Sequence, residues 1–224
     1  MSSRRKTLQL IVSAVIPGMV AGCTLSFTDE PTTTATTTAT PTPPGIQELL
    51  TEKIQISSTI QSQAAAEHPP IIEFTVTNDS QSELTITPSG SGQALEMLQR
   101  YTSDDESTLI PYPVDPEHMG FGPPVSESAE TTDCWRLPDD FSIMVEDMVF
   151  ELTIEAGEAY SKRHYLFYEG ATDTCFPSNE YEMETTIKMT RPTGDEARVH
   201  LNSQITSSQS QHLSATARFE FDST

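Results

Sequence analysis

Alternating apolar and polar positions run through residues 45–224 and predict β-strands. Successive side chains of a strand point to opposite faces of a sheet, so a period of two indicates strands with one buried face. One strand is expected over residues 159–168. The apolar positions of the others are Ile54, Ile56 and Ile60; Ile72, Phe74 and Val76; Leu84 and Ile86; Phe150, Leu152 and Ile154; Tyr181, Met183, Ile187 and Met189; Val199, Leu201 and Ile205; and Leu213, Ala215, Ala217, Phe219 and Phe221. About eight such strands predict an all-β domain.

Turn-forming residues separate these stretches at positions 78–80, 156–158 and 192–195. Helical spacing is confined to one short segment with Ala94, Met97, Leu98 and Tyr101. Strands linked by turns, without helices between them, favour an antiparallel sandwich. Residues 102–141 are rich in proline and acidic side chains, and we expect them to form one long loop insertion.

The predicted strand over residues 159–168 carries aromatic side chains on both faces. They include Tyr160, Tyr165, Phe167 and Tyr168, with His164 between them. One face belongs to the core by the period-two pattern. The other face is either a contact surface for a partner or a strand face covered by a loop of the same chain.

Residues 1–22 have the pattern of a signal peptide. A basic start, Ser3-Arg4-Arg5-Lys6, precedes a largely apolar run over residues 8–20. This run is shorter than the roughly 20 apolar residues that a permanent membrane helix needs.

Val20-Ala21-Gly22-Cys23 resembles a lipobox, the cleavage signal of exported lipoproteins. The resemblance implies cleavage before Cys23 and attachment of a lipid to its sulfur, with membrane lipid as the partner of Cys23. Residues 3–8 also resemble a twin-arginine export signal, although Thr7 stands where that signal favours Phe. The alternative is an ordinary secretory signal with an unrelated cysteine.

Residues 23–44 form a linker dominated by Thr, Ala and Pro. The segment lacks a periodic apolar face that could offset the entropy of ordering it. We therefore predict a lipidated, disordered stalk that carries a domain over residues 45–224.

The charge balance is strongly acidic. Loss of residues 1–22 removes three of the 12 basic residues and leaves nine against 33 acidic ones, a net charge of about −24. This balance disfavours nucleic acid as a partner, because phosphates need a basic surface. Spread-out acidity with few lysines, the leader, the lipobox-like motif and the Thr-rich linker together resemble surface lipoproteins of halophilic archaea. The alternative is an acidic patch that binds cations or a basic partner.

A second resemblance concerns the fold. Residues 175–181, Cys-Phe-Pro-Ser-Asn-Glu-Tyr, resemble the Pro-x-Gly-x-Tyr start of a strand in immunoglobulin-like domains, with Asn179 in the place of Gly. Asn tolerates positive φ better than most residues, so we expect the turn to be kept. The resemblance implies an immunoglobulin-like antiparallel sandwich.

Once Cys23 is assigned to lipid, Cys134 and Cys175 remain as an even pair outside the cell. Such a pair predicts a disulfide. The alternative is a redox or metal-binding thiol pair, although the two cysteines lack CxxC spacing. Asn78-Asp79-Ser80 is in addition an acceptor sequence for N-glycosylation, in a predicted turn.

The remaining sequence predicts no catalytic, cofactor or metal site. The five histidines are scattered singly, without the HxH or HExxH spacing of metal ligands. We therefore expect a lipid-anchored extracellular surface protein on the cell membrane, a non-catalytic binding or structural module whose partner is an envelope protein or glycan. The alternative is a proteinase-inhibitor-like or envelope-enzyme domain, with residues 133–137 as its working loop.

Overall fold

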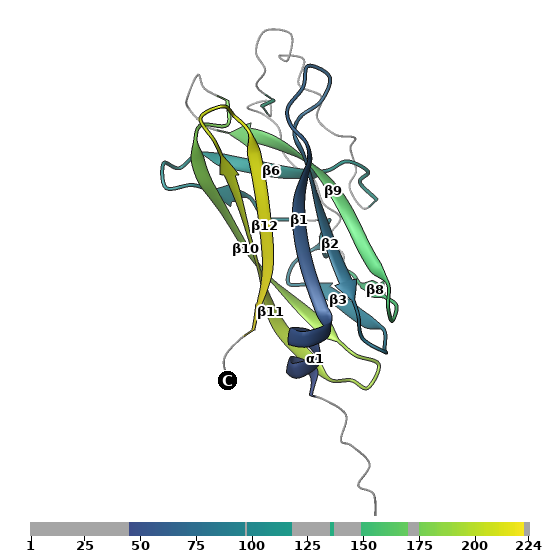
Figure 1. Ribbon diagram of the computed structural model, residues 1–224. Helices are drawn as coiled ribbons and strands as arrows, with labels where there is room; N and C mark the ends of the chain where they lie inside the picture. Colours follow the sequence, from purple (N-terminus) through teal and green to yellow (C-terminus); the bar gives the residue numbers. More distant parts are fainter. Residues whose placement is uncertain (1–44, 97, 118–134, 137–148, 170–174, 222–224) are drawn as a thin grey trace, which may run out of the picture. The chain divides into compact units, whose positions relative to one another are not determined.

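The computed structural model describes residues 45–96, 98–117, 135–136, 149–169 and 175–221 (Figure 1). In these residues the chain is all-β with one short helix, so the predicted class is confirmed. The elements are α1 (Ile46–Lys53), β1 (Ile54–Ser62), β2 (Ile71–Asn78), β3 (Leu84–Pro88), β4 (Gly92–Gln93), β5 (Tyr101–Thr102), β6 (Thr108–Pro113), β7 (Val149–Phe150), β8 (Leu152–Ile154), β9 (Ala159–Glu169), β10 (Asn179–Thr190), β11 (Glu196–Ser207) and β12 (Leu213–Phe221).

The main sheet is antiparallel and follows the order β1-β2-β9-β6-β5-β10-β11-β12. β3 leaves this path because it pairs with the last residues of β10 and with β8, while β4 and β7 form a short parallel pair. The first and last strands, β1 and β12, lie side by side (Figure 1). The amide side chain of Gln63 links them, donating to Leu213 O at 2.9 Å and accepting from Leu213 N at 2.8 Å. The sheet therefore curls round until its ends meet.

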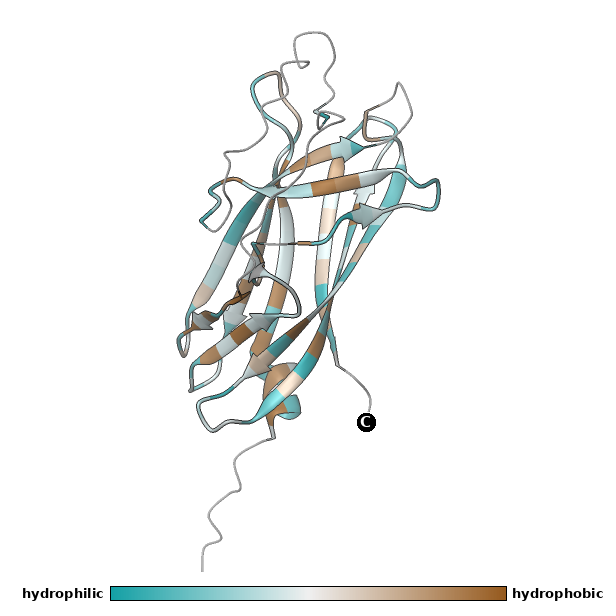
Figure 2. Cartoon of the chain, turned by 180° about the vertical axis from the view of Figure 1, so that it is seen from behind, coloured by the Kyte–Doolittle hydropathy of each residue, from teal (hydrophilic) through white to brown (hydrophobic). Residues whose placement is uncertain are grey.

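The core lies inside this curled sheet. The inward positions of β2, Ile72, Phe74 and Val76, have no exposed surface, and the same holds for Val199, Leu201 and Ile205 of β11. Figure 2 shows apolar and polar residues alternating along the long strands, which is the pattern that predicted them. Burial of apolar surface contributes about 25 cal/mol per Å² and is the main force that holds such strands together.

β6 lies inside the stretch that the sequence predicted as a long loop. It pairs with β9 over its whole length, and Leu109, Ile110 and Tyr112 are buried. Pro111 and Pro113 are tolerated because their backbone nitrogens, which carry no hydrogen, point away from β9. Val114 N donates to Arg163 O, so by the period of two the nitrogens of the two prolines face the opposite side. β5 on that other side pairs with only Leu109 and Thr108, so the prolines interrupt no ladder. Residues 118–134 and 137–148 of the predicted insertion lie outside the described residues.

Two further local predictions need correction. The segment with helical spacing forms a turn over residues 94–96, and Tyr101 begins β5, whereas the helix of the described part is α1. The left-handed backbone near the start of β10 occurs at Phe176 (φ 46°) and not at Asn179. The Oδ1 atom of Asn179 instead accepts a hydrogen bond from Glu180 N at 3.0 Å.

Candidate functional site

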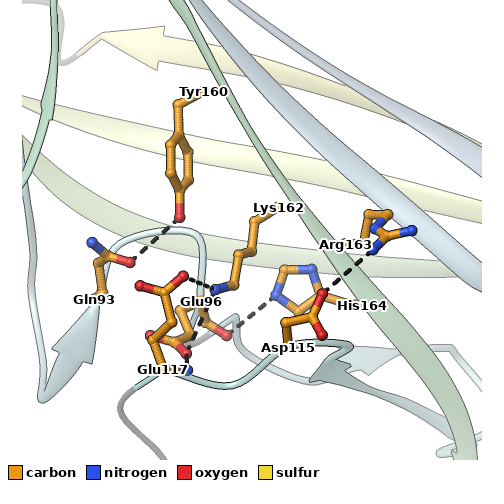
Figure 3. A network of polar contacts seen from close by, with 8 residues as sticks. All are labelled: Gln93, Glu96, Asp115, Glu117, Tyr160, Lys162, Arg163 and His164. Carbon is orange, nitrogen blue, oxygen red and sulfur yellow. Dashed lines mark hydrogen bonds and ion pairs between the residues drawn. The ribbon is translucent and has the colours of Figure 1, made fainter. Parts of the chain in front are cut away.

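The most unusual group of side chains is a buried polar cluster on β9, drawn in Figure 3. We call it the Lys162 cluster; it contains Glu96, Glu117, Lys162 and His164. Lys162 is 7% exposed and Glu96 is 1% exposed, although both carry ionisable groups. Residues of this type are seldom buried unless they are paired, so each contact in the cluster matters for folding.

The Lys162 ammonium forms ion pairs with two carboxylates. Lys162 Nζ lies 3.2 Å from Glu117 Oε1 and 3.8 Å from Glu96 Oε1. Glu96 Oε1 also accepts a hydrogen bond from Glu117 N at 2.6 Å. Glu96 follows Leu95, whose φ of 65° is rare for a branched residue and marks a strained turn. The cluster therefore ties this turn and the segment after β6 to the inner face of β9.

His164 is fully buried next to Lys162 on the same face of β9. Its Nε2 lies 3.2 Å from Glu96 O, and because a carbonyl only accepts, Nε2 carries the hydrogen. Burial lowers the pKa of His164 to about 4, and the nearby Lys162 charge acts in the same direction. His164 is thus a neutral hydrogen-bond donor that holds the Glu96 backbone, with Phe74 against the edge of its ring.

The rim of the cluster opens to a small hollow of about 250 Å³ that is lined by Tyr160, Lys162, Arg163 and three carboxylates. Tyr160 Oη donates to Gln93 Oε1 at 3.4 Å, and Arg163 Nη2 lies 3.4 Å from Asp115 Oδ2 (Figure 3). Burial first, and then the charges of Glu117 and Glu96, raise the pKa of Tyr160. The ammonium and the imidazole each already hold a partner, so this arrangement suits a structural network that fixes two segments on β9.

One feature of the sequence indicates this cluster. Lys162 and His164 occupy the same period-two positions as Leu166 and Tyr168, which predicts that they point inward. Lys162 is also one of only three lysines after residue 22. A scarce lysine at an inward strand position implies a buried acidic partner.

The outer face of β9 is covered, which decides between the two predicted alternatives for its aromatic residues. Phe167 packs with Ile110, Tyr112 and Trp135 in a second hydrophobic cluster, with Tyr165 at its edge. Trp135 is 5% exposed, its Nε1 donates to Ala65 O at 2.9 Å, and its carbonyl accepts from Tyr168 N. The loop alternative is therefore right for this part of the strand.

Arg136, which belongs to the predicted working loop over residues 133–137, lies beside the end of β9. It forms a bridge with Tyr168, and its guanidinium lies 5.2 Å from the centre of the Tyr168 ring. This stacking is a cation–π contact that favours a structural role for Arg136. Residues 133, 134 and 137 of that predicted loop lie outside the described residues.

The structure places the predicted site residues as follows. Cys175 is buried and disulfide-bonded. Cys134 lies outside the described residues, so its pairing with Cys175 stays a prediction. Cys23 lies outside them as well. In the described part of the chain, no helix has the length and apolar character needed to cross a membrane, and no group of ligand-type side chains is arranged to hold a metal ion.

Asn78 has no exposed surface, which argues against its predicted glycosylation. Its Nδ2 donates to three carbonyls, those of Ser82, Ile154 and Glu155, at 2.9–3.1 Å. Its Oδ1 accepts from the hydroxyl and the backbone N–H of Ser80. The amide that would carry a sugar is therefore engaged in the folded domain, and the acceptor sequence marks a buried turn anchor.

Tyr181 near the start of β10 makes a hydrogen bond back along the chain. Its hydroxyl donates to Pro177 O at 3.2 Å, four residues upstream. Immunoglobulin-like domains also have a tyrosine near the start of a strand whose hydroxyl bonds to the backbone a few residues upstream. Comparison of the whole chain with protein-family models, with curated proteins and with solved structures gives no match.

Proposed function

We propose that this chain is a lipid-anchored surface protein of the outer side of the cell membrane, with a non-catalytic binding or structural domain of the envelope. The observation that carries the proposal is Cys23, which follows Ala21 and Gly22 at the end of the apolar run. Two lipid chains on this sulfur are enough for stable anchoring. An immunoglobulin-like sandwich is the form we propose for the domain, supported by the Tyr181 hydrogen bond.

The layout of the described domain suits this role. α1, where the anchored linker would join, precedes β1, and the loop over residues 63–70 lies at the other end of that strand. The β11–β12 hairpin lies at the same end as that loop, because Gln63 contacts Leu213. These loops therefore lie at the end of the domain opposite α1.

We also propose that Cys134 and Cys175 form a disulfide. Trp135 and Phe176, the chain neighbours of the two cysteines, both contact Tyr168: Trp135 O accepts from its backbone N–H, and the Phe176 ring lies 6.0 Å from its ring centre. This arrangement brings the two chain segments to the same part of β9. The bond would hold the Trp135 cover over the second hydrophobic cluster.

Anchoring can be tested on the chain produced in a host that processes lipoproteins. We expect the intact mass to lack residues 1–22 and to include a lipid, and Cys23→Ser to lose that lipid and leave the membrane fraction. Thr24→Ser is the matched control and should stay in the membrane. An unmodified Cys23 in membrane-bound protein would refute the anchor.

The module role is tested on intact cells. A crosslinker applied from outside should join the wild-type protein to an envelope protein or glycan, and Cys23→Ser should lose this product together with its place on the surface. Recovery of uncrosslinked protein only, from cells where surface labelling shows it to be present, would contradict a binding role.

A further inference from the structure

Two of the nine basic residues that follow the leader face each other across two strands. Lys188 of β10 is the register partner of Arg198 of β11, and on its other side it is the partner of Thr87 of β3. We call these three residues the Thr87 row. Their sequence neighbours Ile187, Met189 and Val199 are buried in the core, so by the alternation of a strand the row lies on the outer face of the sheet.

The pairing of Lys188 with Arg198 is unfavourable by itself. Like charges directly opposite each other on neighbouring strands destabilise a sheet. The counter-charge within reach is Glu196, whose Oε2 lies 3.7 Å from Lys188 Nζ, and both side chains are about half exposed, at 63% and 49%. In the described part of the chain no carboxylate forms an ion pair with Arg198. A protein with so few cations therefore keeps two of them together with little neutralisation.

Thr87 adds a hydroxyl to the row. Its Oγ1 is buried and has no hydrogen-bond partner among the described residues. A buried hydroxyl without a partner is unfavourable, because the hydrogen bonds it made to water are lost. Rotation about the Cα–Cβ bond would bring this hydroxyl to the surface, where an oxygen of a bound anion would accept its hydrogen.

A hollow of about 640 Å³ lies over the row. It is lined by Thr87, Lys188 and Arg198 together with Pro88, Ser89, Ile187, Glu196 and Ala197. The hollow is larger than a single sulfate or carboxylate group. It therefore has room for an acidic group together with the unit of a larger molecule that carries it.

We propose that the Thr87 row is a binding site for an oxyanion, a sulfate, phosphate or carboxylate group carried by an acidic polysaccharide of the envelope. A guanidinium offers two parallel N–H groups to such an anion, the ammonium adds a point charge, and the hydroxyl adds a third kind of donor. The anion removes the repulsion between Lys188 and Arg198. The inference rests on the proposed function only in placing the acidic polysaccharide in the envelope.

The site itself can be measured by NMR on the purified chain. Inorganic phosphate and sodium sulfate are titrated separately against sodium chloride at equal ionic strength, while the backbone amides of the row and the side-chain Nε–H of Arg198 are followed. We expect saturable shifts at these groups with phosphate or sulfate and not with chloride. Shifts that stay linear, or that spread evenly over the outer face, would mean a general salt effect and would overturn the site.

Variants of the row separate direct binding from a change of fold. Lys188→Gln and Arg198→Gln should each weaken the anion about tenfold, since each removes charge-assisted hydrogen bonds. Thr87→Val should weaken it less. Glu196→Gln should tighten binding several-fold, because it frees Lys188 from its competing carboxylate, and Lys53→Gln on α1 should leave binding unchanged. Equal affinity in Lys188→Gln and wild type, or weaker binding by Glu196→Gln, would contradict the proposal.

Thermal unfolding gives a second readout with opposite signs in the two salts. In chloride, Lys188→Gln should unfold at a higher temperature than wild type because the repulsion is relieved. In millimolar phosphate the order should reverse, because only the wild type gains from the bound anion. The same order in both salts would rule out a specific anion.

The same titration carried out with charged polymers decides the source of the oxyanion. Dextran sulfate and polygalacturonate present sulfate and carboxylate groups, free phosphate is the small-ion arm, and neutral dextran is the control. Tighter binding of an acidic polymer than of free phosphate supports the envelope partner, and binding of free phosphate alone refutes it. The mass of the Cys23 peptide is independent of all these results, so a failure here and a failure of the anchor are distinguishable.

Discussion

Asn78 shows how a single side chain can connect distant parts of this fold. Its amide reaches the turn after β2 and the end of β8, while its backbone pairs with the turn after β8: Asn78 N donates to Glu158 O, and Asn78 O accepts from Gly157 N. Both polar atoms of its side chain are fully used. The residue is thus a structural anchor at the end of the domain that carries α1.

Replacement of Asn78 by Asp keeps the shape and removes the donors. We expect Asn78→Asp to lower the free energy of unfolding by on the order of 3 kcal/mol, because a carboxylate would face three carbonyl oxygens in a buried site. Asn202→Asp on the outer face of β11, opposite Arg218, should change it little. Urea unfolding of the two variants measures the difference, and mass analysis of the wild-type peptide should find Asn78 without a glycan.

His164 predicts a pH dependence of stability. Burial lowers its pKa from about 6.5 to about 4, so the folded state prefers the neutral ring. The stability from this group is complete above pH 6.5 and is lost as the pH falls toward 4, because the unfolded chain takes up the proton first. The slope approaches about 1.4 kcal/mol per pH unit within this window.

His164→Gln keeps an N–H donor and has no proton to gain. The difference in unfolding free energy between wild type and His164→Gln should therefore shrink as the pH falls from 6.5 to 4, which denaturant unfolding at several pH values measures. His200→Gln is the control, since His200 is partly exposed and contacts Glu184 at 3.0 Å. A constant difference for His164→Gln would mean that the ring is not buried in the neutral form.

At the scale of elements, three hairpin turns share one hydrogen-bond pattern. They span residues 103–107, 191–195 and 208–212, and in each the first residue pairs with the fifth and the fourth N–H returns to the first carbonyl. The fourth residue is left-handed in all three: Glu106 has φ 65°, Gly194 has φ 87° and Gln211 has φ 60°. Only one of these turns therefore has the residue that suits the backbone.

These turns predict substitutions of opposite sign. Glu106→Gly and Gln211→Gly should each stabilise the domain by roughly 0.5–1 kcal/mol, because glycine adopts this backbone without strain. Gly194→Ala should cost about 1 kcal/mol although no atom lies near its added methyl group, whereas Gly90→Ala, in equally open space without a positive φ, should be neutral or better. Thermal unfolding of the four variants tests the pattern, and equal effects at Gly194 and Gly90 would contradict it.

The proposed pair of Cys134 and Cys175 gives a prediction for the Trp135 cover. Cys134→Ser and Cys175→Ser should destabilise the domain by similar amounts, up to about 4 kcal/mol for a loop of some 40 residues, and the double variant should lose no more than either one. Cys23→Ser should leave the unfolding curve unchanged. Additive losses at Cys134 and Cys175 would mean that the two sulfurs are not joined.

Strand positions were predictable because the core needs one thing from each strand, an apolar side chain at every second position. The same rule placed Lys162 and His164 inside, but their partner Glu96 lies 66 and 68 residues away from them in a turn without periodicity, so no local pattern could identify it. β6 was missed because Pro111 and Pro113 are read as breakers, and their tolerance depends on the shortness of β5. The buried state of Asn78 depends on β8, which is also distant in sequence.

At the scale of the whole molecule, the acidic charge includes a column of carboxylates on the outer face of β10. Glu180, Glu182 and Glu184 follow each other at alternate, exposed positions, roughly 7 Å apart along the strand. Gln204 and His200 of β11 are the neutral or weakly basic neighbours that contact them. Repulsion within this column destabilises the folded state less at high salt, because the Debye length falls from ~10 Å at 0.1 M to ~3 Å at 1 M.

We therefore expect the unfolding temperature to rise as potassium chloride increases from 0.1 M to molar concentrations. The triple substitution of Glu180, Glu182 and Glu184 by Gln should raise this temperature by a few degrees at low salt and by less at high salt. Thr206→Ser on β11 is a control that keeps the charge. A salt response of the triple variant equal to that of wild type would show that repulsion lies elsewhere.

The contact between β1 and β12 has a consequence for how the protein is made. β1 is synthesised early, and its inward residues Ile56 and Ile60 are partly buried against the core that the last strand completes with Ala215, Ala217 and Phe219. A nascent chain without β12 leaves this seam open to water until residues 213–221 have been synthesised. Closure therefore depends on β12, and a nascent chain stalled before residue 213 would expose the inner side of its first strand to chaperones and proteases.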